Sequence, residues 1–138
     1  MPLARPKINC RRYLCRGRVR RCGWYIASLL RCLGVPARLS GFNYLVETLL
    51  LLVNRPFETR LVTGEVYPVV AKQCNTTPIG VDQAIRTAVN QTWQEQNIPV
   101  YCALMGRSPA PHEPRPTSCE FLANVLMYVR IQMAECHY

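Results

Sequence analysis

The segment from Asn75 to Trp93 constrains the fold more than any other part of the chain. Thr77 can act as an N-cap, because its hydroxyl can accept a hydrogen bond from a backbone N–H one turn on. Pro78 suits the first helical position, where its missing N–H costs nothing. Small and apolar side chains then recur at helical spacing and form one stripe: Val81, Ala84, Ile85, Ala88, Val89, Thr92 and Trp93. The pattern predicts an amphipathic helix that packs one face on a core.

A polar face lies opposite this stripe. Its members are Asp82, Gln83, Arg86, Thr87, Asn90 and Gln91. Arginine, glutamine and asparagine are side chains that can hydrogen-bond base edges in the major groove of DNA. The alternative is a polar face that only meets water, as on most surface helices.

The residues before this helix favour the DNA interpretation. Residues 61–74 place four side chains at helical spacing: Val66, Val69, Val70 and Cys74. Pro68 cannot lie deep inside a helix, so this helix either starts near Tyr67 or is kinked there. Two helices joined by the short turn 75–77 make a helix-turn-helix, in which the second helix enters the groove and the first crosses the backbone.

Two more helices are expected earlier in the chain, at residues 24–33 and 42–54. Gly34 is a typical residue to end the first one. Ser40 can cap the second one. The inner face of the second helix is Leu45, Leu49, Leu52 and Val53.

The C-terminal part continues the helical pattern. Pro99 is expected to close the long helix, and a proline-rich loop follows at residues 109–116. Thr117 and Glu120 form a capping box that starts a last helix. That helix places along one side Phe121, Leu122, Val125, Val129 and Met133. With no alternating strand pattern of useful length, the chain is predicted to be all-α, a compact bundle of about five or six helices.

The net charge of +9 is concentrated at the N-terminus. Residues 1–24 hold eight basic side chains and no acidic one, whereas residues 25–138 carry nine basic and eight acidic groups. We therefore expect a disordered basic arm at 1–24 and a helical DNA-binding domain at 25–138. The arm is typical of a phosphate-binding tail, and a solubilising tail is the alternative. An export leader is disfavoured, because Arg31 interrupts its apolar stretch. The expected non-specific phosphate contacts are Arg11, Arg12, Arg16, Arg18, Arg20 and Arg21.

The eight cysteines are interpreted as free thiols in a reducing cytoplasm, because the chain is longer than scaffolds that depend on disulfides. Cys10, Cys15 and Cys22 lack the Cys-x2-Cys spacing of structural zinc sites, so no metal is expected.

Enzymatic and membrane functions find little support. His112 and His137 lie in the proline-rich loop and near the C-terminus, where neither can activate a nucleophile. We predict no enzyme activity, no cofactor and no small-molecule substrate. The most apolar run, residues 49–53, is far shorter than the ~20 residues that span a bilayer, so no membrane contact is expected.

The chain contains a series of short motifs in a specific order and spacing. They are Gly34-Val35-Pro36-Ala37, Gly41, Tyr44-Leu45, Tyr67-Pro68, Ala71-Lys72, Asn75-Thr76-Thr77, Val81, Ala84-Ile85-Arg86, Ala88, Trp93, Asn97-Ile98, Pro116-Thr117 and Glu120-Phe121. Together they resemble the C-terminal effector domain of the response regulator that starts sporulation in endospore-forming bacteria. The resemblance covers about residues 26–134.

The resemblance implies an all-helical, sequence-specific DNA-binding transcription regulator whose helix from Pro78 to Trp93 enters the major groove. Arg86 stands where the family has an arginine that contacts DNA. Lys72 keeps a basic position on the preceding helix, and Asp82 replaces a glutamate at another contacting position.

Other positions depart from the family. Gln83 and Gly80 stand where it has arginines, and Thr87 stands where it has a histidine. Because a bidentate base contact contributes roughly 1–3 kcal/mol, DNA binding is expected to be weaker, aimed at another sequence, or absent. The expected DNA-binding residues are Lys72, Thr77, Asp82, Gln83, Arg86 and Thr87.

The expected partner is double-stranded DNA in the bacterial cytoplasm and nucleoid, with self-association along DNA as in the family. The short run before the domain cannot contain a receiver, so regulation by phosphorylation of its own receiver is not expected. We hypothesise that the arm binds phosphates in place of the arginines that are missing from the reading helix. The alternative function is a protein-interaction module on the same scaffold.

Overall fold

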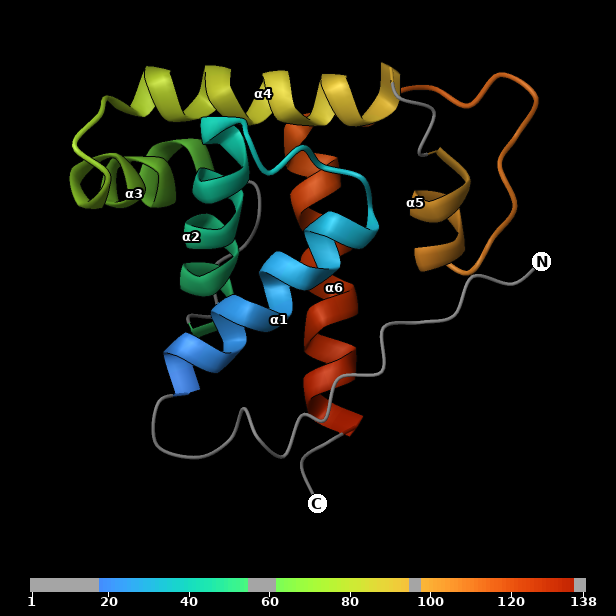
Figure 1. Ribbon diagram of the computed structural model, residues 1–138, viewed down its shortest axis with the longest axis horizontal. Coiled ribbons are helices and arrows are strands. Elements are labelled where there is room, and N and C mark those ends of the chain that lie inside the picture. Colours follow the sequence, from blue (N-terminus) through green and yellow to red (C-terminus); the bar gives the residue numbers. More distant parts are fainter. Residues whose placement is uncertain (1–17, 55–61, 95–97, 136–138) are drawn as a thin grey trace.

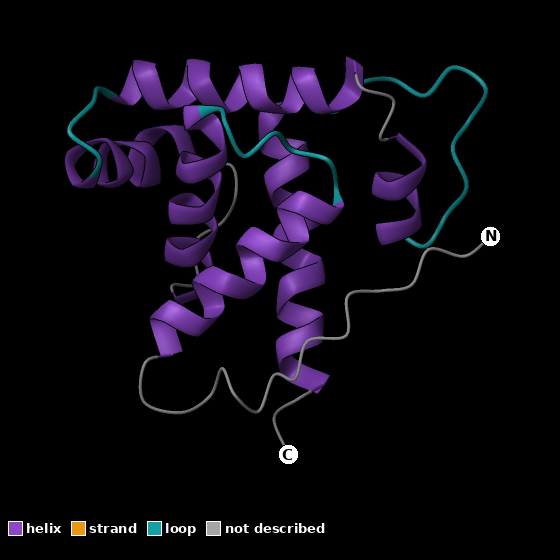
Figure 2. Cartoon of the chain, viewed as in Figure 1, coloured by secondary structure: helices purple, strands orange, loops and turns teal. Residues whose placement is uncertain are grey.

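The computed structural model describes residues 18–54, 62–94 and 98–135, and every element in these ranges is helical (Figure 2). The elements are α1 (Arg18–Cys32), α2 (Ser40–Asn54), the π-helical turn η3 (Val62–Val66), α3 (Tyr67–Gln73), α4 (Pro78–Gln94), α5 (Ile98–Leu104) and α6 (Ser118–Glu135). The prediction of an all-α bundle is confirmed.

Helix α2 is the central support of the bundle. Its residues Leu45, Leu49 and Leu52 have no exposed surface, and the helix contacts α1, α4 and α6. Burial of each leucine contributes roughly 1.5–3 kcal/mol relative to an exposed position. Figure 1 shows α4 lying across the N-terminal ends of α2 and α6, so the long helix forms one face of the molecule.

A glycine on α2 allows α4 to come very close. A Cβ at Gly41 would lie 2.2 Å from the carbonyl oxygen of Ala84 and 2.9 Å from the Cβ of Ala88. Any side chain at this position would therefore push α4 away. The backbone contact fixes the position of α4 on the bundle.

Several helix ends agree with the sequence, and two differ from it. Gly34 has a φ of 87° just after α1, as expected for a residue that ends a helix. However, α1 begins at Arg18 and not near Trp24, since arginine favours helix as strongly as leucine does. The prediction that Pro99 closes the long helix is wrong: α4 ends at Gln94, and Pro99 lies in the first turn of α5, where proline is tolerated.

The sequence allows two forms for the helix before the turn, a start near Tyr67 or a kink there. The structure has η3 up to Val66 and α3 from Tyr67, with Pro68 in its first turn. The start near Tyr67 is therefore the correct alternative, and a π-helical turn precedes it. None of the described helices is both long enough and apolar enough to cross a membrane.

Candidate nucleic-acid interface

The α3–turn–α4 unit has the geometry of a helix-turn-helix. The backbone N–H of Cys74 donates to the carbonyl of Val70 at 2.9 Å, and that of Thr76 donates to Ala71 at the same distance. Between them Asn75 adopts a φ of 55°, a left-handed conformation that asparagine tolerates better than most residues. These bonds end α3 and turn the chain sharply toward α4.

The first turn of α4 is capped as predicted. The hydroxyl of Thr77 accepts a hydrogen bond from the backbone N–H of Gly80 at 3.0 Å. A Cβ at Gly80 would lie 2.8 Å from the hydroxyl of Thr76 and 3.1 Å from that of Thr77. The glycine thus leaves room for the cap at a position where the family has an arginine.

The two faces of α4 separate as the sequence predicted. Val81, Ile85, Ala88, Val89 and Thr92 are buried, whereas Gln83, Arg86 and Thr87 are exposed. Lys72 is also exposed, on the last turn of α3. A helix that buries one stripe and leaves arginine and amide side chains outside can present them to base edges.

Two side chains on this exposed face interact with their own helix. The Arg86 Nε lies 3.2 Å from a carboxylate oxygen of Asp82, one turn earlier, while 70% of the Arg86 side chain stays exposed. The Thr87 hydroxyl donates to the carbonyl of Gln83 at 2.9 Å. Asp82 therefore orients the Arg86 guanidinium without burying it, and the methyl group of Thr87 remains available for a thymine methyl.

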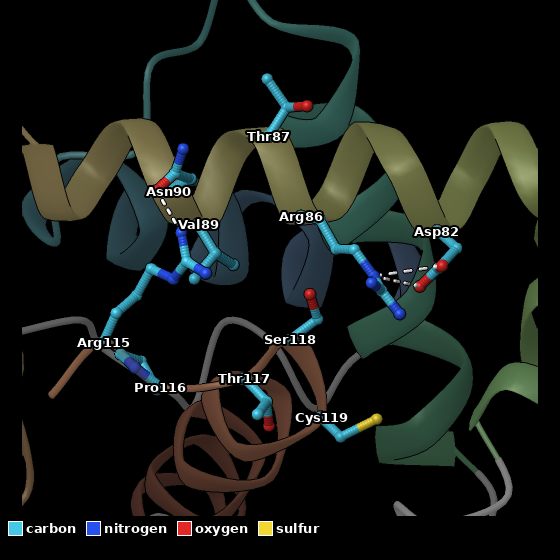
Figure 3. Close-up of a pocket in the computed structure, with 10 residues that line it drawn as sticks. All are labelled: Asp82, Arg86, Thr87, Val89, Asn90, Arg115, Pro116, Thr117, Ser118 and Cys119. Atoms are coloured by element: carbon cyan, nitrogen blue, oxygen red, sulfur yellow. Dashed lines mark hydrogen bonds and ion pairs between the residues drawn. The ribbon is translucent and has the colours of Figure 1, made fainter.

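A groove separates α4 from the start of α6 (Figure 3). It has a volume of about 380 Å³ and is lined by Asp82, Arg86, Thr87, Val89, Asn90, Arg115, Pro116, Thr117, Ser118 and Cys119. Across it, the Nη1 of Arg115 donates to the Oδ1 of Asn90. The predicted cap at Thr117 is also present, since its hydroxyl accepts from the backbone N–H of Glu120 at 3.1 Å.

A buried tyrosine of α3 lies close to the charges of this groove. Tyr67 is only 1% exposed, and its hydroxyl has no hydrogen-bond partner among the described residues. Burial raises the pKa of Tyr67, the neighbouring Cys119 and Asp82 side chains raise it further, and the charge of Arg86 lowers it. The hydroxyl is therefore neutral at physiological pH.

The predicted contact residues are only partly gathered in one place. Asp82, Arg86 and Thr87 line the groove, while Gln83, Thr77 and Lys72 lie on the helix-turn-helix outside its lining. The backbone of three arm residues belongs to α1, namely Arg18, Arg20 and Arg21. The remaining expected phosphate contacts, Arg11, Arg12 and Arg16, lie outside the described residues.

Seven of the ten groove residues fall outside the predicted contact set, and a hydrogen bond across the groove joins two of them, Asn90 and Arg115. Asn90 belongs to the polar face of α4, and Arg115 lies near the end of the proline-rich loop, 25 residues further along the chain. No local pattern pairs positions so far apart, although the capping box at Thr117 marks the place where the loop returns to the bundle.

No group of histidine, cysteine or acidic side chains within the described part of the chain could hold a metal ion. Cys32, Cys74, Cys102 and Cys119 are free thiols.

An all-helical bundle that carries a capped helix-turn-helix with a polar second helix belongs to the class of helical DNA-binding domains. A family model described as "Sporulation initiation factor Spo0A C terminal" matches residues 26–129, which is most of the chain. The chain therefore belongs to this family of bacterial DNA-binding effector domains, which act in the transcriptional regulation of sporulation. The resemblance found in the sequence is confirmed.

Proposed function

We propose that this protein is a sequence-specific DNA-binding transcription regulator in which α4 reads the major groove. The observation that carries the proposal is the separation of the two faces of α4. One face is fixed on the core by Val81, Ile85 and Ala88, and the other holds Gln83 and Arg86 in the open beside the turn from α3. A rigid helix with exposed polar side chains meets the geometric need of direct readout.

The exposed residues have distinct roles in this proposal. Arg86 donates to a guanine, for which its forked guanidinium is well suited, and Asp82 holds that fork in direction. Gln83 hydrogen-bonds an adenine, and Thr87 contacts a thymine methyl group. Lys72 contributes a point charge to the DNA backbone from α3.

The wider setting follows from the same proposal. The partner is double-stranded DNA in the cytoplasm, and copies of the protein associate along it. The basic arm, through residues such as Arg11 and Arg12, adds phosphate contacts that carry no sequence information. No catalytic step, cofactor or small-molecule substrate is needed.

The direct test is fluorescence-anisotropy binding of the full chain to a duplex with the family's 0A box and to a scrambled duplex, at near-physiological salt. Arg86→Lys is the informative variant, because lysine keeps the charge and cannot make the two-pronged contact. We expect wild type to prefer the box, and Arg86→Lys to lose most of that preference while binding the scrambled duplex as before. Equal binding of both duplexes by the wild type would contradict readout of this box.

One observation favours a different function, a protein-interaction module. Ile79, in the first turn of α4, is 69% exposed, and residues 25–138 are nearly neutral in charge. An isoleucine cannot hydrogen-bond a base edge, and a nearly neutral domain attracts DNA phosphates only weakly, so this face also suits a protein partner. If both duplexes bind equally weakly, an Ile79→Ser variant in light scattering tests this alternative: loss of a self-associated species would support it.

A further inference from the structure

The groove between α4 and α6 has an unbalanced charge. Of its ten lining residues only Asp82, Arg86 and Arg115 are charged. Asp82 and Arg86 form an ion pair at 3.2 Å and largely compensate each other. Arg115 has no acidic partner among the described residues, and its one hydrogen bond there, to the amide oxygen of Asn90, leaves most of its guanidinium N–H groups available.

The position of Arg115 relative to α4 is set by the structure. Asp82, Arg86 and Asn90 are spaced four residues apart, so they stack along one flank of the helix at intervals of about 6 Å. Figure 3 shows Arg115 reaching from the loop before α6 to this flank, where the dashed line joins it to Asn90. The buried ring of Pro116 anchors the backbone next to it.

We infer that Arg115 is a DNA phosphate contact, held by Asn90 beside the reading helix and separate from the helix-turn-helix itself. The inference rests on the proposed function and extends it.

The major groove is about 12 Å wide, so a helix inside it has a phosphate strand along each flank. The flank that carries Asn90 then meets one strand, and Arg115 is the positive charge that faces it. A forked guanidinium suits a phosphate. Asn90 is a positioning residue.

The experiment measures affinity for the box and for the scrambled duplex at several salt concentrations, using the full chain. Each phosphate contact contributes about 0.9 to the slope of log affinity against log salt. Arg115→Gln should therefore reduce that slope by about one and lower affinity for both duplexes about fivefold at 0.15 M salt. Asn90→Ala should lower affinity less, because the charge of Arg115 remains.

The matched control is Arg107→Gln. Arg107 lies in the same loop, but its guanidinium pairs with Glu113, so its removal should leave the salt slope unchanged and lower affinity only by the small entropic cost of a less ordered loop. Thermal melting of each variant verifies that it folds. An Arg115→Gln variant that melts and binds like wild type overturns the inference. In that case the proposed function still stands if the wild type prefers the box. If the preference for the box is absent but Arg115→Gln still lowers the slope, the phosphate contact stands and readout of the box fails. A wild-type protein that binds neither duplex overturns both.

Discussion

On the side of α4 that faces α2, two backbones touch, because Gly41 leaves nothing between them but the carbonyl of Ala84. On the side that faces α6, an open groove is crossed by one hydrogen bond between Arg115 and Asn90. The first contact excludes water and admits no added atom. The second is polar, exposed and adjustable. One helix is thus fixed on one side and left accessible on the other.

The residues that hold α4 on the bundle therefore differ from the residues through which α4 is proposed to bind DNA. Changes on the α2 side should alter the free energy of unfolding, and DNA binding only through the fold. Changes on the α6 side should alter binding and leave stability nearly unchanged.

The largest effect is expected from Gly41→Ala. The new Cβ would lie 2.2 Å from the carbonyl oxygen of Ala84, so α2 and α4 must separate. We expect a decrease of about 3 kcal/mol or more in the free energy of unfolding, measured by urea denaturation. Gly64→Ala is the control, since no atom of the described residues outside its own helix lies within 4 Å of its added Cβ, and it should be as stable as wild type. If both variants are equally stable, the close contact between Gly41 and Ala84 does not fix α4 on the bundle.

A smaller effect is expected at the start of α4. Thr77→Ala removes the hydroxyl that accepts from the N–H of Gly80, which should cost about 1 kcal/mol of stability. Thr77→Ser keeps the acceptor and should stay close to wild type in the same denaturation assay. If the alanine and serine variants are equally stable, the cap contributes nothing measurable.

A third prediction concerns Tyr67, which is buried next to the charges of the groove. Its buried hydroxyl has no partner among the described residues, so Tyr67→Phe should be neutral or stabilising by up to about 1 kcal/mol. Tyr101 is the matched tyrosine, because its hydroxyl accepts a hydrogen bond from Asn124 at 2.6 Å, and Tyr101→Phe should destabilise by about 1 kcal/mol. Wild type should also lose stability above pH 10, where the unfolded chain ionises Tyr67 and the folded one does not; the phenylalanine variant should lose less. A strongly destabilised Tyr67→Phe variant would contradict this account.

The smallest effect concerns the loop that leads to the open side. The Arg107 guanidinium and the N–H of Ala110 lower the pKa of Glu113 from 4.5 to about 2. Because the folded pKa is the lower one, the pair stabilises the loop above pH 4.5, and this contribution disappears as the pH falls toward 2. An NMR titration of the Glu113 carboxyl group should show the lowered pKa in wild type and a pKa shifted upward in Arg107→Gln, where the N–H of Ala110 still lowers it. A normal value in wild type would mean that the loop lacks this contact in solution.

The side of α4 that packs on the core was predictable from sequence, and the groove side was not. The apolar stripe with Val81, Ile85 and Ala88 follows from helical spacing alone, and the cap at Thr77 follows from local chemistry. The bond between Asn90 and Arg115 joins positions 25 residues apart, and only the packing of α6 against α4 brings them together.

Two local signals were ambiguous for physical reasons. Pro99 is compatible both with the end of one helix and with the first turn of the next, and the structure has the second case. The start of α1 at Arg18 was hidden because a run of arginines looks alike in a helix and in a charged tail.

The order of the proline-rich loop also affects the entropic cost of the proposed contact between Arg115 and DNA. Within the connection from α5 to α6, Glu113 accepts hydrogen bonds from Arg107 and from Ala110, and Pro116 is buried where the loop reaches α6. Ordering one backbone residue costs roughly 1–2 kcal/mol, whereas immobilising one long side chain costs about 0.5–1.5 kcal/mol. Since the backbone around Arg115 is ordered before DNA arrives, a phosphate need only restrict one side chain, and most of the entropic penalty of this contact falls on folding instead of binding.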